Sequence, residues 1–269
     1  MSSISETISN ICLPVHTVSK NRKLIFALTL RMWRSRGKDG LFAALWPILT
    51  PFILLGVYYY VFGVILDFRQ GVGGANYALS MFCGISVFNI FAESMNSGAQ
   101  SMIAHPGYVK NAMFDLEVLP LSGVGCALIS GLIYLLTVFA AAGCSGIFRW
   151  QAVMVPVSLL PYLLFCAGIA MFCGAMSVFL RDFPIFLLLL QQGLFFLTPI
   201  IYPMSKVPDT CRKVIEYNPL TGYVESIRSA LLGNVEFSNW HWLWINGIAV
   251  YLLGFCFFRK TRKGFADVI

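Results

Sequence analysis

Six long stretches without a sustained charge constrain this chain of 269 residues more than any other feature. A bilayer core about 30 Å thick requires about 20 consecutive apolar residues for each helix that crosses it. Only 12% of the residues are charged, whereas a soluble domain carries about 25%. None of the stretches alternates with period two, so we expect an all-α integral membrane protein rather than a β-barrel. The six transmembrane helices are expected at about 41–64, 77–99, 118–142, 152–179, 183–203 and 238–258.

The positions of Lys and Arg set the expected orientation. Most of the 19 basic residues precede the first span, follow the sixth, or lie on the same side at Lys110 and Arg181. By the positive-inside rule both termini are cytoplasmic, including a tail over 261–269. A polar segment over 1–19 lacks the apolar core of a cleavable signal peptide. The net charge of +7 then reflects topology and contact with anionic lipid rather than nucleic acid binding.

An amphipathic pattern precedes the first span, over residues 20–36. At helical spacing Lys23, Arg31 and Arg34 share one narrow face, and apolar residues occupy most of the remainder. The pattern predicts an N-terminal interface helix that lies on the inner leaflet. A simple basic flank of the first span is the alternative.

The loop after the second span covers residues 101–115 and is large enough for a short cytoplasmic helix. A cytosolic partner would have to contact mainly this loop and the N-terminal helix. The candidate contact residues are Ser101, Met102, His105, Pro106, Gly107, Tyr108, Lys110 and Asn111.

Glu93 interrupts the second apolar stretch. A charge in hydrocarbon is costly, so an acid within a span is a functional candidate by default. A hydrogen bond from this acid to a neighbouring helix is the structural alternative.

Prolines break the chain at defined points after the fifth span. Residues 199–233 are too charged to span a membrane and too apolar for an ordinary loop. They predict two short re-entrant helices in the outer leaflet, which requires that protein or a water-filled cavity cover them. The segment therefore indicates a conduit with an outer gate, whose candidate residues are Pro199, Pro203, Asn218, Pro219, Glu225 and Arg228.

Signatures of enzymes and metal sites are weak. The chain has no P-loop, no CxxC and no Cys/His metal spacing. A Gly-x-Ser-Gly sequence around Ser145, with His241 expected on the same side, resembles an intramembrane serine protease, but small residues are also expected in that turn between spans. We expect no catalytic residue and no metal here, and leave open whether Cys144 and Cys211 form a disulfide.

Several motifs in a fixed order resemble a known family. They are the basic amphipathic helix, Gly-Leu-Phe-Ala-Ala-Leu-Trp-Pro at 40–47, Phe-Asp-Leu-Glu-Val-Leu-Pro-Leu at 114–121, Phe-Leu-Arg-Asp at 179–182, Thr-Pro-Ile-Ile-Tyr-Pro at 198–203 and Asn-Pro-Leu at 218–220. Over residues 20–260 the chain is similar to the membrane subunit of type-2 ABC exporters, and most similar to permeases for O-antigen, capsule or teichoic-acid polysaccharides. Asp115 departs from the family, which usually has Pro after Phe.

The resemblance implies a homodimeric permease in the bacterial inner membrane, paired with two ATP-binding cassette subunits that hold ATP and Mg²⁺. This chain would bind no cofactor and export a lipid-linked polysaccharide. The segment 101–111 would be the coupling helix, and residues 199–232 the outer gate helices. The first and fifth spans would line the path, with aromatic candidates for stacking on sugar rings at Tyr58, Tyr59, Phe195, Phe196 and Tyr202. The alternatives are a small-molecule or drug exporter of the same architecture, the protease, and a membrane scaffold.

Overall fold

The chain is helical throughout the residues that the computed structural model describes, which are 2–35, 46–65, 74–109, 114–146, 150–202, 204, 207–233 and 240–268. The elements are α1 (Ser2–Ser35), α2 (Trp46–Tyr58), a π-helix η1 (Tyr59–Ile65), α3 (Gly74–Ile103), α4 (Pro106–Val109), α5 (Val118–Cys144), a 3-10 helix η2 (Trp150–Met154), α6 (Val155–Phe179), α7 (Phe183–Leu197), α8 (Asp209–Tyr217), α9 (Pro219–Leu232), α10 (Trp240–Thr261), a 3-10 helix η4 (Arg262–Gly264) and α11 (Phe265–Val268).

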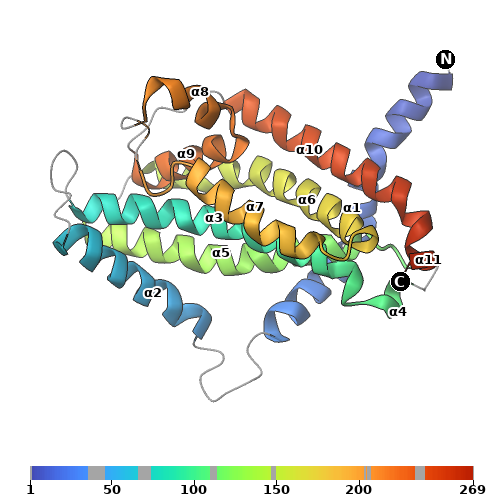
Figure 1. The fold of residues 1–269 in the computed structure, drawn as a ribbon, viewed down its shortest axis with the longest axis horizontal. Coiled ribbons are helices and arrows are strands. Elements are labelled where there is room, and N and C mark those ends of the chain that lie inside the picture. Colours follow the sequence, from blue (N-terminus) through green and yellow to red (C-terminus); the bar gives the residue numbers. More distant parts are fainter. Residues whose placement is uncertain are drawn as a thin grey trace.

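Four helices are long and apolar enough to cross a membrane: Tyr77–Ile103, Val118–Cys144, Gln151–Phe179 and Trp240–Gly264. The shortest is 25 residues, or about 38 Å at 1.5 Å per residue. They run side by side, with α3 packed between α5 and α6, and α10 packed on the other side of α6 (Figure 1). The apolar window of α3 is 78% buried, the largest share of the four, so α3 is the centre of the bundle.

Two expected spans are shorter apolar helices. The first, predicted over 41–64, corresponds to the apolar helix Trp46–Val61, and its helical path continues through η1 to Ile65. The fifth was predicted over 183–203, but α7 ends at Leu197, because Thr198 is extended and Pro199 follows. At 15 residues α7 is about 22 Å long, which is less than the hydrocarbon thickness.

The N-terminal helix starts earlier than the sequence pattern indicates. α1 begins at Ser2 and includes the segment predicted as a polar tail. It crosses the end of the bundle near α4 and α11 and packs on α5 (Figure 1). At this crossing the buried Thr29 donates a hydrogen bond from Oγ1 to the Ser122 carbonyl oxygen at 3.2 Å.

Glycines allow α10 to approach α6 at backbone distance. A Cβ added to Gly168 of α6 would lie 2.7 Å from the Cα of Tyr251, and one added to Gly254 of α10 would lie 2.9 Å from the Cα of Gly168. These atoms belong to backbone, so no side-chain rotation can relieve the clash. Close approach of this kind is how helices associate in lipid, where apolar burial offers little driving force between them.

The substitution Gly254→Ala should therefore destabilise the protein by about 2 kcal/mol, as overpacking does. Gly193→Ala in α7 is the matched control, because nothing lies within 4 Å of its added Cβ. We would compare thermal unfolding midpoints of the detergent-purified variants. Equal midpoints for the two variants would contradict the close α6–α10 packing.

Candidate functional site

A buried carboxylate organises the end of the bundle near α4. Glu117 is 2% exposed and lies directly before α5. Its two oxygens accept hydrogen bonds from Arg262 Nη1 at 3.3 and 3.2 Å, and Arg259 Nε lies 3.7 Å away. Arg262 Nη2 also donates to the Phe114 carbonyl oxygen at 2.7 Å. The start of η4 is thereby joined to the loop 114–117.

The same loop is joined to α1 through Asp115. Its Oδ2 accepts from Asn21 Nδ2 at 2.8 Å and from Lys20 Nζ at 3.4 Å. The Asn21 hydrogen bond, with a smaller contribution from Lys20, lowers the pKa of the Asp115 carboxyl below its usual value. The residue that departs from the family pattern thus anchors the N-terminal helix, which the sequence alone did not indicate.

The predicted coupling segment divides into a buried and an exposed part. Ser101 and Met102 end α3 and are 4% and 0% exposed, so they cannot form a docking surface as predicted. Pro106 and Gly107 are exposed in α4, a single turn that ends at the buried Val109. His105 before the turn and Tyr108 within it are half-buried.

Tyr108 connects α4 to the loop 114–117. Its ring packs on the Phe114 ring with centroids 4.7 Å apart. Lys110 and Asn111 lie outside the described residues. The described part of this segment is therefore exposed at Ile103, Ala104, Pro106 and Gly107, and the turn of α4 is backed by the Tyr108–Phe114 contact.

The predicted basic face of the N-terminal helix is exposed. Lys23, Arg31 and Arg34 all point away from the bundle, whereas Leu28 and Thr29 pack against it. The basic side of the predicted amphipathic helix is thus its exposed side, and the opposite side packs on α5.

At the opposite end of the bundle, a buried Arg228 joins three segments. The residue is 6% exposed and pairs with Glu225 one turn earlier on α9. Its Nε donates to the Ser80 carbonyl oxygen of α3 at 3.1 Å, and its Nη2 donates to the Pro199 and Ile200 carbonyl oxygens at 3.1 and 3.4 Å. One guanidinium therefore fixes α9, α3 and the chain after α7.

Two of the predicted gate prolines, Pro199 and Pro219, lie with Asn218 at this end of the bundle. Asn218 Oδ1 accepts from the Leu220 backbone N–H at 3.1 Å, so it caps α9, and Pro219 occupies the first turn, where a missing N–H is tolerated. Asn218 Nδ2 donates to Thr198 Oγ1 at 3.1 Å, next to Pro199. Pro203 lies outside the described residues.

The two helices of the predicted gate differ in their surroundings. α9 is buried against α3 and α6, whereas nearly every residue of α8 is exposed. α8 thus lies on the surface of this end of the bundle, and α9 alone enters it.

The five predicted path aromatics do not share one environment. Tyr58 packs on Phe82 of α3 at 6.2 Å between ring centroids, and Phe195 packs on Phe88 at 5.2 Å. Tyr202 donates a hydrogen bond to the Phe196 carbonyl oxygen at 2.8 Å. Tyr59 and Phe196 are 50% and 66% exposed, so these two present their rings outside the protomer.

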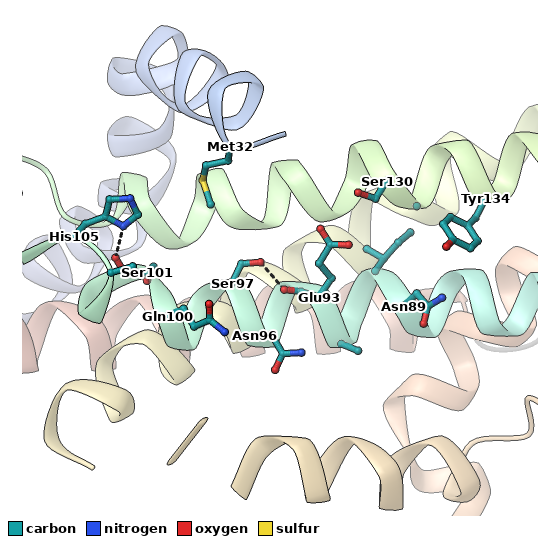
Figure 2. A pocket seen from close by; sticks show the side chains of 14 residues that line it. Met32, Asn89, Glu93, Asn96, Ser97, Gln100, Ser101, His105, Ser130 and Tyr134 are labelled. Atoms are coloured by element: carbon teal, nitrogen blue, oxygen red, sulfur yellow. Dashed lines mark hydrogen bonds between the residues drawn. The ribbon is translucent and has the colours of Figure 1, made fainter. Parts of the chain in front are cut away.

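Glu93 lies in a groove of about 540 Å³ that runs along α3 beside α5 and the end of α1 (Figure 2). Its side chain is half-buried. Asn96 lines the same groove and exchanges side-chain hydrogen bonds with Gln191 of α7 at 3.0 and 3.3 Å. The sequence analysis missed this amide pair, although Gln191 stood out as a polar residue in the Leu- and Phe-rich fifth stretch.

The protease residues are exposed at helix ends. Ser145 follows α5, and His241 is in the first turn of α10. Neither lines the groove. Cys144 and Cys211 are free, and the described residues hold no group of His, Cys, Asp or Glu that could bind a metal ion.

Replacing Arg228 by Met should destabilise the protein by about 3 kcal/mol, since Glu225 would be left buried without its cation. Adding Glu225→Gln should recover part of the loss. Arg212→Met removes an exposed ion pair of similar spacing in α8 and should change the unfolding midpoint little. Equal midpoints for Arg228→Met and Arg212→Met would contradict a structural role for the buried pair.

The sequence is similar to known transport proteins over nearly its full length. The O-antigen export system permease protein RfbA of Klebsiella pneumoniae is 26% identical over 252 residues, which cover 91% of this chain and 95% of that protein. A second Klebsiella pneumoniae protein of the same name is 25% identical over 253 residues. The RfbA of Myxococcus xanthus is 26% identical over 220 residues, or 80% of this chain and 82% of that protein.

The family pattern described as ABC-2 type transporter matches residues 23–232. This range contains α4, the loop 114–117, the groove on α3 and the buried Arg228. Together with four helices long enough to cross a membrane, it identifies a multi-pass membrane protein that serves as a transport subunit. The chain belongs to the ABC-2 type transporter family.

Proposed function

We propose that this chain is the channel-forming permease subunit of an ATP-driven exporter for a lipid-linked polysaccharide. The observation that carries the proposal is the alignment with O-antigen export permeases over 95% of their own length. A match of that extent supports a shared architecture rather than a shared segment. The 15% aromatic content agrees with a substrate that stacks on rings.

In this proposal two copies form the conduit in the bacterial inner membrane, and two ATP-binding subunits bind from the cytoplasm. Residues 20–260 form the transport domain, with α2 and α7 as the first and fifth of six spans. Both termini and α4 are cytoplasmic, which agrees with the basic residues at that end of the bundle. The partner subunits would bind ATP and Mg²⁺, and this chain would form the translocation path for the substrate.

Mechanical coupling would pass from α4 into the bundle through the loop 114–117. ATP-driven closure of the partner subunits would push Pro106 and Gly107. Tyr108 packs on Phe114, and Glu117 is held by Arg262. A displacement of α4 would therefore be transmitted to α10 through packed and hydrogen-bonded side chains. α10 moves α6 with it, because the two backbones are in close contact. Rigid-body shifts of packed helices are an established form of such transitions.

At the outer end, α9 would act as the gate. Its position depends on Arg228, which also holds α3 and the chain after α7. A shift of α3 or α7 would therefore be transmitted to α9. Tyr59 and Phe196 are the aromatics best placed to contact a polymer between two protomers, since their rings are exposed on this one.

The first test is to delete the gene in its native host and to measure surface polysaccharide and co-purification of an ATPase with a tagged copy. Gly107→Arg should release the ATPase and abolish export, because it places a bulky charge on the exposed turn of α4. Ser145→Ala, at the other end, should leave both unchanged. Loss of activity in Ser145→Ala would instead favour the protease.

Two other outcomes separate the remaining candidates. Normal surface polysaccharide in the deletion strain, with an ATPase still bound to the tagged protein, would favour a small-molecule exporter of this family. The absence of any bound ATPase would favour a scaffold.

Glu117→Gln should reduce export while the ATPase remains bound to the permease. The amide keeps the size of the side chain but loses the charge that holds Arg262 and Arg259. We expect the ATPase to co-purify at wild-type yield while export falls severalfold. Lys260→Gln is the control, because this exposed side chain lies at the end of α10, next to Arg259 in the chain. Wild-type export by Glu117→Gln would exclude this route of coupling.

A further inference from the structure

The groove along α3 is lined by many polar side chains. It extends from Asn89 to His105, which is about 24 Å along a helix. Its lining comes from three helices: Met32 of α1, Ser130 and Tyr134 of α5, and the polar face of α3 (Figure 2). One end therefore lies beside α4, and the other lies near the middle of α3.

The polar side chains of this groove differ in their surroundings. Asn89 and Gln100 are exposed, so they add no buried packing. Polar residues within a membrane helix are costly and mark a path or a site when they gather on one face. Asn96, which also lines the groove, is hydrogen-bonded to Gln191 of α7.

The chemistry of the lining favours a neutral ligand rich in hydroxyl groups. None of the described lining residues is Lys or Arg, and Glu93 contributes a carboxylate, so a phosphate or pyrophosphate group would be repelled. Carboxamides at Asn89 and Gln100 both donate and accept hydrogen bonds. The Tyr134 ring adds a flat apolar surface. A sugar offers the matching set of hydroxyls and an apolar ring face.

Figure 2 shows the Glu93 side chain rising from α3 toward α5, on the side where Ser130 and Tyr134 lie. Ser97 Oγ donates to the backbone carbonyl oxygen of Glu93, so this hydroxyl is directed to the helix and away from the carboxylate. The volume of about 540 Å³ falls within the range of ordinary small-molecule sites, which is about 300–1,000 Å³.

We propose that this groove binds a neutral stretch of the polysaccharide as it loads from the cytoplasmic side, with Glu93, Asn89 and Gln100 hydrogen-bonded to sugar hydroxyls. The proposal rests on the proposed function. It places substrate contact on the second span, directly beside the α4 turn on which the ATPase would act. The site of substrate loading would then lie next to the turn that the ATPase moves.

Photo-crosslinking in cells tests the contact directly. A benzophenone amino acid would replace Gln100 in the tagged, full-length chain, expressed in the native host lacking its own copy. The matched control carries the same residue at Leu253 of α10, which is 71% exposed on an apolar face. After irradiation, the purified permease would be stained for carbohydrate and analysed for bound phospholipid.

Carbohydrate attached at position 100 and absent at position 253 is the expected result. Phospholipid alone at position 100, or no adduct there while the cells still export polysaccharide, would overturn the groove assignment and leave the proposed function intact. If the wild-type chain restores no surface polysaccharide to the deletion strain, the proposed function fails, and the groove assignment fails with it.

Two substitutions of Glu93 identify the kind of ligand. Glu93→Gln keeps an oxygen acceptor for a sugar hydroxyl, whereas Glu93→Leu removes it. Export should fall about tenfold in Glu93→Leu, as for the loss of a hydrogen bond to a charged group, and by much less in Glu93→Gln. Equal loss in both, with the ATPase still bound, would indicate a cation at Glu93 and would contradict a sugar site.

Discussion

Charge in a lipid-embedded bundle is tolerated only where the protein supplies its partner, and this constraint fixes both ends of the structure. Glu117 at one end is buried with Arg262 and Arg259, and Arg228 at the other is buried with Glu225 and three carbonyl oxygens. Breaking such a pair leaves an uncompensated buried charge. The two clusters therefore act as rigid joints, and the apolar helices between them can move only as units.

Local patterns predicted much of this arrangement. The prolines after the fifth stretch predicted two short helices over residues 199–233, and α8 and α9 lie within that range. The third, fourth and sixth stretches predicted α5, α6 and α10 within a few residues of their ends. In each case the signal lies within one or two helical turns, because a cap, a proline or an apolar run acts on its immediate neighbours.

The long-range joints could not be predicted in the same way. Glu117 and Arg262 are 145 positions apart, and Asn96 and Gln191 are 95 apart. Nothing in either local sequence specifies the other, since the pairing arises from how α3, α7 and α10 pack. The burial of Ser101 and Met102 has the same origin. A loop long enough for a helix was visible, but the residue at which α3 would leave the bundle depended on the α3–α6 contact.

The helix α3 contacts the groove, α7 and α9. A helix that carried only packing roles could be apolar throughout, yet α3 presents Glu93, Asn89 and Gln100 to a groove that ends beside α4. The same helix is held by Gln191 of α7 and by Arg228 of α9. Occupation of the groove and displacement of α4 would therefore act on the same helix. Since α3 also carries the carbonyl oxygen that accepts a hydrogen bond from Arg228, this helix would transmit loading at the proposed inner side to the proposed gate at the other end.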